Sequence, residues 1–194
     1  MLGLASWIVR PSGESHVITF VAARRREGTS SVALEFARAA REFVGSRVLI
    51  VDATPRTILR DHPGRALLDT LRDQLPLELA IARSEDEVDR ATLSEPGDPY
   101  PVLERTPDLG ELWRPLRERY DTIAIDAPSL DESPLGLVLA RSSDAVIVVV
   151  QAERTRRPVV RRLVDLLRQT GAPVAGTVLN QRRHYIPRFI YDRL

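Results

Sequence analysis

The chain contains no cysteine and no lysine. The absence of cysteine excludes disulfides and thiolate metal sites. All of its basic side chains other than histidine are arginines, so no lysine of this chain can supply a compact ammonium group to a catalytic site. Histidine is also scarce, and His16, His62 and His184 are too scattered along the sequence to predict a metal cluster.

Long apolar stretches are missing as well. The longest, Ala145–Val150, is far shorter than the roughly 20 residues that a transmembrane helix needs. The N-terminal residues lack an early basic segment, so they resemble no signal peptide, and we expect a cytoplasmic protein, with the inner face of the membrane as an open alternative. The formal net charge of +1 gives no general attraction for nucleic acid, which we do not expect as a partner.

The length and composition predict one folded domain. With 194 residues, 43% hydrophobic and 28% charged, the chain has the composition of a globular protein and enough residues for a full core. We expect a single domain over residues 1–194, with an N-terminal arm at 1–16 and a C-terminal docking tail at 181–194, where aromatic and apolar residues alternate with arginines.

The stretch from Val17 to Arg56 organises the sequence. A short apolar run, Val17–Ala22, predicts a buried strand, and apolar residues at helical spacing predict a helix over Thr29–Val44. A second apolar run ends in Asp52. Because the first amides of a helix lack partners inside it and lie at the positive end of its dipole, the loop before Thr29 is predicted to bind a phosphate.

This loop departs from the Walker A pattern G-x-x-x-x-G-K-[ST]. It reads Ala23, Arg24, Arg25, Arg26, Glu27, Gly28, Thr29, Ser30. Gly28 and the hydroxyl of Ser30 are in place, whereas Ala23 replaces the first glycine and Thr29 stands at the lysine position. The loss of that lysine removes stabilisation of the charge that develops during phosphoryl transfer. Arg24, Arg25 and Arg26 are the alternative source of positive charge.

The rest of the chain alternates between expected strands and helices. Helices are predicted around Leu67–Leu75, after Asp108 to Arg119, up to Arg141 and over Thr155–Gly171, and a further helix is predicted to open at Ser84–Glu87 before Val88. Strands are predicted at Thr122–Asp126, Val146–Val150 and Val174–Asn180. This alternation predicts an α/β fold: a three-layer, P-loop NTPase-like arrangement with a mostly parallel sheet and helices on both faces.

Three segments resemble one known family. They are R-V-L-I-V-D-A-T-P-R at Arg47–Arg56, Y-D-T-I-A-I-D-A-P at Tyr120–Pro128, and the closing strands at 143–150 and 174–180. In this order and spacing they are similar to the bacterial tyrosine kinases, the cytoplasmic kinase domain of exopolysaccharide and capsule co-polymerases, which are themselves relatives of the ParA/MinD ATPases. The resemblance covers residues 17–180, nearly the whole chain.

The resemblance implies a site for ATP and Mg²⁺. It assigns the nucleotide to the loop residues Arg24, Arg25, Arg26, Glu27, Gly28, Thr29, Ser30 and Ser31, and places Asn180 near the adenine. It assigns Mg²⁺ to Ser30, Asp52 and Asp126, the two aspartates also being the relic catalytic residues. Independently of the resemblance, a carboxylate at the end of a strand, such as Asp126, faces the crevice where α/β sheets bind ligands; the alternative for Asp126 is a structural cap on its turn.

Several departures from the family pattern point away from an active kinase. Besides Thr29, two more positions differ. Thr54 stands where the family has the second acid of the segment Arg47–Arg56, called Walker A′, and Arg24 stands where the ParA/MinD group has its signature lysine. The C-terminal tyrosine cluster is reduced to the autophosphorylation candidates Tyr185 and Tyr191. Only residues 1–16 precede the first strand, so the oligomerisation helix of the family is expected to be missing. We therefore expect ATP and Mg²⁺ binding to be weak or lost.

Three functions stay open. The first is a degenerate kinase-like subunit that binds a membrane polysaccharide co-polymerase or a related kinase. The second is an ATP-binding protein with residual ATPase or tyrosine autokinase activity. The third is a positioning ATPase of ParA/MinD type that uses a basic helix face, Arg154, Arg157, Arg161 and Arg168, on DNA or a membrane, although a solvated face is the default. Homo-oligomerisation and peripheral membrane contact are left as alternatives.

Overall fold

The computed structural model describes residues 14–55, 65–94 and 109–182. These residues form a six-stranded sheet in the order β3-β2-β4-β1-β5-β6, in which all pairs are parallel. The strands are β1 His16–Ala22, β2 Val48–Asp52, β3 Val88–Thr92, β4 Thr122–Asp126, β5 Ala145–Gln151 and β6 Val174–Asn180.

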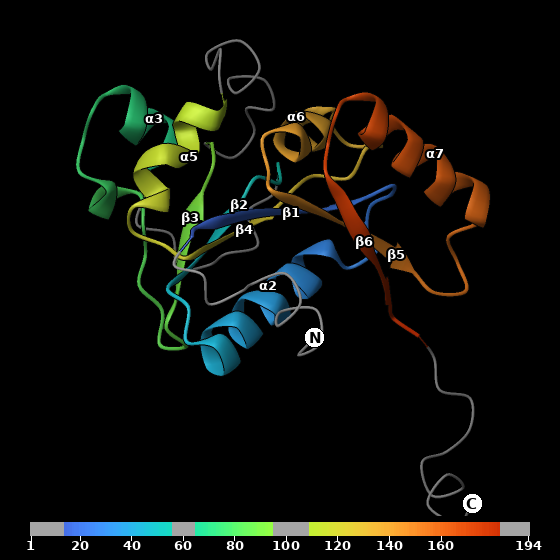
Figure 1. Cartoon of the computed structure of the whole chain (residues 1–194), viewed down its shortest axis with the longest axis horizontal. Coiled ribbons are helices and arrows are strands. Elements are labelled where there is room, and N and C mark those ends of the chain that lie inside the picture. The colour runs from blue at the N-terminus through green and yellow to red at the C-terminus, as the bar shows by residue number, and fades with distance from the viewer. Residues whose placement is uncertain (1–13, 56–64, 95–108, 183–194) are drawn as a thin grey trace, which may run out of the picture.

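Helices cover both faces of this sheet (Figure 1). They are α2 Thr29–Ala39, α3 Leu67–Arg72, α5 Leu109–Arg117, α6 Leu135–Arg141 and α7 Arg157–Gln169, with a π-helical turn η1 at Ala40–Val44 and a 3₁₀ turn η2 at Leu77–Leu79. Helix α2 packs on one face, and α3, α5, α6 and α7 pack on the other. The expected three-layer α/β fold is confirmed.

The central strands are apolar on both sides because both of their faces are covered. In β5 the run Val146–Val150 is buried throughout, as is usual for strands of a parallel sheet. On the α2 face the rings of Phe20 and Phe36 pack at a centroid distance of 5.1 Å. On the other face Trp113 is fully buried and its indole nitrogen donates to the Ser142 hydroxyl at 3.0 Å.

One expected helix is wrong. Ser84–Glu87 opens no helix: the residues form a turn in which Glu87 N donates to Ser84 O at 3.1 Å, and Val88 begins β3. The acids at this point suggested a first helical turn, but β3 pairs in register with β2 and its Val88 is buried in the core. Sheet pairing therefore determines the structure here, and local propensity does not.

The other helices follow the expected positions with shorter ends. The helix expected over Thr155–Gly171 begins at Arg157 and ends at Gln169, and the one expected to Arg119 ends at Arg117. Some expectations lie outside the described residues: Asp108, after which one helix was expected, the autophosphorylation candidates Tyr185 and Tyr191, and most of the expected arm and tail. None of the described helices is both long and apolar enough to cross a membrane.

Candidate functional site

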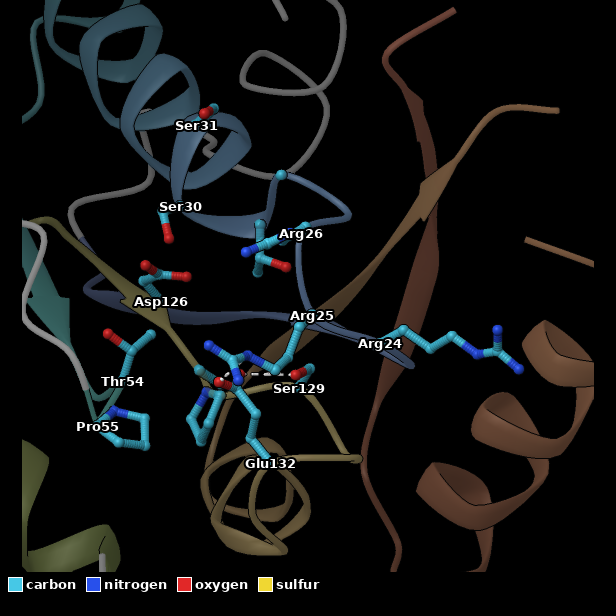
Figure 2. A pocket seen from close by; sticks show the side chains of 14 residues that line it. Arg24, Arg25, Arg26, Ser30, Ser31, Thr54, Pro55, Asp126, Ser129 and Glu132 are labelled. Carbon is cyan, nitrogen blue, oxygen red and sulfur yellow. Dashed lines mark hydrogen bonds and ion pairs between the residues drawn. The ribbon is translucent and has the colours of Figure 1, made fainter. Parts of the chain in front are cut away.

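The loop between β1 and α2 borders a cavity at the carboxyl ends of the central strands (Figure 2). The chain leaves β1 at Ala22, passes through left-handed backbone at Arg26 and Gly28, with φ of 64° and 87°, and enters α2 at Thr29. The cavity has a volume of about 330 Å³. Its lining residues are Arg24, Arg25, Arg26, Gly28, Thr29, Ser30, Ser31, Thr54, Pro55, Asp126, Ala127, Pro128, Ser129 and Glu132.

The start of α2 retains the features of an anion site. Gly28 precedes the helix and no side chain caps its first turn. The first amides of a helix have no partner within it and lie at the positive end of its dipole. The segment Gly28–Ser31 lines the cavity, so this half of the loop is still suited to an anion.

The first half of the loop binds carboxylates of the chain itself. Glu27 is 2% exposed, and its Oε2 accepts hydrogen bonds from the amides of Ala23 at 3.1 Å and Arg24 at 3.3 Å. Its Oε1 accepts a hydrogen bond from the Thr155 hydroxyl. The next amide, of Arg25, donates to Asp131 Oδ1 at 3.1 Å. Glu27 therefore anchors the loop from behind and is absent from the cavity lining.

Two of the three loop arginines do not take the place of the Walker A lysine. The Arg25 guanidinium forms an ion pair with Glu132, with Nε and Oε1 2.6 Å apart. The Arg24 side chain extends from the cavity toward the side of α7 (Figure 2). Arg26 is exposed at the rim.

Two carboxylates lie side by side at the carboxyl ends of neighbouring strands. Asp52 and Asp126 occupy the same register position on β2 and β4, and they are 2% and 3% exposed. The Asp52 Oδ1 accepts hydrogen bonds from the Thr54 amide at 2.8 Å and from the Thr54 hydroxyl at 2.6 Å. Thr54, at the position of the missing acid, is thus a donor to the acid that remains.

Asp126 has no comparable set of donors. Figure 2 shows the Ser30 hydroxyl directed at Asp126, but the buried Oδ1 has no hydrogen-bond partner. Burial raises the pKa of Asp126 to about 8; the Ser30 hydrogen bond opposes this shift, while the charges of Asp52 and Glu132 add to it. The acid is therefore largely protonated at neutral pH.

The end of β6 closes over the loop. The Asn180 side-chain amide donates to the carbonyl of Glu27 at 3.1 Å and to that of Gly28 at 3.4 Å. The next side chain, Gln181, donates to Arg26 O at 3.3 Å. Asn180, expected near an adenine, is placed against the loop backbone and does not line the cavity.

Comparisons with known proteins identify relatives among kinases. The chain is 30% identical over 145 residues to EpsB of Ralstonia nicotianae, whose name classes it as a tyrosine-protein kinase. It is 26% identical over 184 residues to the tyrosine-protein kinase CpsD of Streptococcus agalactiae serotype III. The solved kinase domain of VpsO superposes with a TM-score of 0.78 at 26% identity, covering 93% of this chain and 92% of that domain. The chain is similar to the bacterial tyrosine kinases.

The extent of the similarity differs between these relatives. The aligned part covers 70% of this chain but only 19% of EpsB, and 87% of this chain and 75% of CpsD. At the level of the fold alone, MinD of Pyrococcus horikoshii, solved with Mg-ADP, superposes with a TM-score of 0.66 at 22% identity over 92% of this chain and 76% of that one. No family model matches the chain. The resemblance to bacterial tyrosine kinases and the P-loop NTPase fold are thus confirmed.

The residues fit the magnesium nucleotide of such P-loop proteins only in part. The unpartnered Asp126 Oδ1 and the Ser30 hydroxyl suit an Mg²⁺ ion, and the amides at the start of α2 suit a phosphate. However, Thr29 occupies the position that lysine holds in the Walker A pattern, and the remaining acid Asp52 accepts a hydrogen bond from Thr54. No cluster of three or more acidic or histidine side chains that could hold a metal is present among the described residues.

Most expected site residues meet at this cavity, and three do not line it. Arg24, Arg25, Arg26, Gly28, Thr29, Ser30, Ser31 and Asp126 line it, whereas Glu27, Asp52 and Asn180 lie behind it. Sequence reasoning missed three residues that follow β4: Asp131 and Glu132, which bind Arg25 of the loop, and Ser129, which donates to Asp131. The available signal was the pair of acids Asp131 and Glu132, which follows the D-A-P segment after two residues.

Proposed function

We propose that this chain is a degenerate kinase-like subunit of a bacterial exopolysaccharide or capsule synthesis and export system. It acts at the cytoplasmic face of the membrane by binding a polysaccharide co-polymerase or an active kinase, and it does not transfer phosphoryl groups efficiently. The similarity to EpsB, CpsD and VpsO supports the kinase-like part of this proposal.

The observation that carries the proposal is the missing Walker A lysine, whose position is taken by Thr29. Phosphoryl transfer depends on fixed positive charge where the transferred group becomes more negative. In the described part of the chain Arg25 is paired with Glu132 and Arg24 points away, so neither takes the place of the lysine. The loss of one such stabilising group lowers turnover by about a hundredfold or more.

Calorimetry with ATP and ADP in the presence of Mg²⁺ tests the proposal. We expect no heat of binding for the natural protein and a gain of binding in Thr29→Lys. Ser31→Lys is the matched control, because it adds the same charge two positions further along the cavity lining and should restore nothing. Phosphorylation of tyrosine by the purified natural protein and ATP would overturn the proposal.

A second candidate is a nucleotide-binding protein with slow ATPase or kinase activity. It is favoured by the uncapped start of α2 and by Arg26 at the rim of the cavity. In that case the natural protein would bind ATP in calorimetry, and Arg26→Ala would weaken this binding. Unchanged affinity in Arg26→Ala would remove the arginine from the proposed role.

A further inference from the structure

The two edges of the sheet are built differently. At one edge, β3 carries the charged residues Asp89 and Arg90, and Arg90 is bridged in antiparallel fashion by Ala82, with N–O distances of 2.8 and 2.9 Å. At the other edge, β6 reads V-A-G-T-V-L-N and has no charged residue. Charges and covering segments are the usual protection of an edge strand against pairing with another chain. Within the described residues, only the β3 edge is protected in this way.

The backbone groups of β6 that face outward can be assigned from its pairing with β5. The carbonyl of Asn180 accepts a hydrogen bond from the Ala152 amide, so Asn180 points its backbone groups toward β5. Because alternate residues of a strand point to opposite neighbours in a parallel ladder, the N–H and C=O groups of Leu179 and Thr177 face away from β5. Both side chains are exposed, Leu179 to 69%.

The helix beside this edge is strongly basic. Helix α7 packs next to β6 (Figure 1), and its exposed arginines, with those of the preceding turn, are Arg154, Arg156, Arg157, Arg161, Arg162 and Arg168. None of these has an ion pair within the described part of the chain. Several arginines elsewhere are paired, for example Arg38 with Asp86 at 3.0 Å and Arg47 with Asp121 at 2.8 Å. The same turn and helix carry only two acidic residues, Glu153 and Asp165, so the surface around α7 has a net positive charge.

We infer that β6 accepts an additional strand from an acidic, extended segment of a partner protein. The outward N–H and C=O groups of Thr177 and Leu179 hydrogen-bond to the backbone of that segment, as in recognition by strand addition. Its acidic side chains face the arginines of α7. This inference rests on the proposed interaction role. It adds the chemistry of the partner segment, which is acidic and extended.

The combination of features selects a polypeptide partner. A lipid surface or a nucleic acid would satisfy the arginines but offers no strand backbone to the edge. A second copy of this chain would offer a strand, but pairing β6 with β6 would bring two helices of net positive charge together. An acidic segment in extended conformation satisfies both the edge and the helix.

Fluorescence anisotropy with the full chain tests this inference. The probe is a short labelled peptide in which Glu and Val alternate, in low salt and without nucleotide. We expect binding that is lost when Lys replaces Glu in the peptide. Leu179→Pro removes one outward amide while leaving the β5 ladder intact and should weaken binding by about threefold to tenfold. Arg161→Glu should weaken it by about threefold.

Controls separate the inference from general electrostatics and from misfolding. Arg83→Glu makes the same charge change at an exposed residue beside the β3 edge and should leave binding unchanged. A peptide methylated at alternate backbone nitrogens should bind weakly, and this result does not depend on any variant folding. Equal losses in Arg161→Glu and Arg83→Glu, or full binding by the methylated peptide, would overturn the inference. So would a dimer of the natural chain that Leu179→Pro dissociates.

The peptide experiment and the tests of the proposed function can fail independently of each other. Nucleotide is absent from the peptide experiment, and the loop is unchanged in every variant. Peptide binding by a chain that also phosphorylates tyrosine would retain the surface and remove the degenerate-kinase role. Absence of peptide binding in a chain that binds no nucleotide would remove the surface and leave that role standing.

Discussion

Asp52 and Asp126 lie in register at the ends of two neighbouring parallel strands, both almost completely buried. Two carboxylates so placed oppose each other's ionisation unless a cation or strong donors compensate them. Here Thr54 supplies two donors to Asp52, while Asp126 retains an unpartnered oxygen. We therefore expect the presence of Thr54 in place of an acid to be coupled to the presence of Thr29 in place of a lysine, since each reduces the charge imbalance that the other creates.

The pH dependence of stability should reveal the protonation of Asp126 in the folded chain. Because its pKa is raised to about 8 from 3.8, the folded chain binds one more proton than the unfolded chain between these values. Its contribution to the free energy of unfolding is complete below pH 4 and falls by about 1.4 kcal/mol per pH unit as the pH rises toward 8. Asp126→Asn should flatten this slope in urea unfolding measured from pH 5 to 8.

Asp121→Asn is the matched control for that experiment. Hydrogen bonding to Arg47 lowers the pKa of Asp121, so its contribution is present above pH 4 and lost only at lower pH. The slope between pH 5 and 8 should be unchanged in Asp121→Asn. An unchanged slope in Asp126→Asn would instead show that Asp126 is ionised in the folded protein at neutral pH.

Thr29 and Thr54 should be energetically coupled through the cavity that both line. Thr54→Asp alone adds a carboxylate beside Asp52 and removes the hydroxyl donor, so we expect a loss of about 1–3 kcal/mol of stability. In the Thr29→Lys background the loss should be smaller by about 1 kcal/mol, because the ammonium group compensates the added charge. Urea unfolding of the four proteins measures the coupling, and strictly additive losses would contradict it.

The sequence predicts the parts of the fold that local pattern controls. The apolar runs of β1 and β5 and the helical spacing in α2 identify these elements, and the loop between β1 and α2 identifies the site. The strand β3 could not be found in this way, because V-D-R-A-T carries two charges and becomes a strand only through pairing with β2.

The roles of individual site residues depend on contacts that no local pattern contains. Glu27 points behind the loop because the backbone turns through left-handed conformations at Arg26 and Gly28, and its partner Thr155 is distant in the sequence. Asn180 reaches the loop only because β6 ends beside it. Sequence reasoning therefore predicted which segments form the site, but not which side chains hold the loop and which line the cavity.

Glu27 should be more important for stability than its surface neighbours. Glu27→Gln retains the volume but replaces a charged acceptor that receives two amides and a hydroxyl, and we expect a loss of about 1–3 kcal/mol. Glu35→Gln, on the exposed side of α2, should change stability by less than about 0.5 kcal/mol. Chemical denaturation compares the two, and equal effects would show that the buried carboxylate contributes nothing specific.

Gly28 should be the glycine of this chain least tolerant of a side chain among those with positive φ. A methyl group on Gly28 would lie 2.1 Å from the Asn180 amide nitrogen, whereas one on Gly45, with φ of 72°, would meet nothing within 4 Å. Both alanine variants bear the cost of left-handed backbone, about 1–2 kcal/mol. Only Gly28→Ala must also displace Asn180 from the carbonyls of Glu27 and Gly28.

The difference between these two glycine variants isolates the contact between β6 and the loop. Gly28→Ala should therefore cost about 1 kcal/mol more than Gly45→Ala, the net value of a displaced hydrogen bond. In an Asn180→Ala background this excess should vanish, because the displaced amide is already gone. Thermal unfolding of the single and double variants measures it. An excess that persists without Asn180 would contradict this prediction and would mean that another neighbour rejects the methyl group, such as the Gln181 side-chain nitrogen, which would lie 3.2 Å from it.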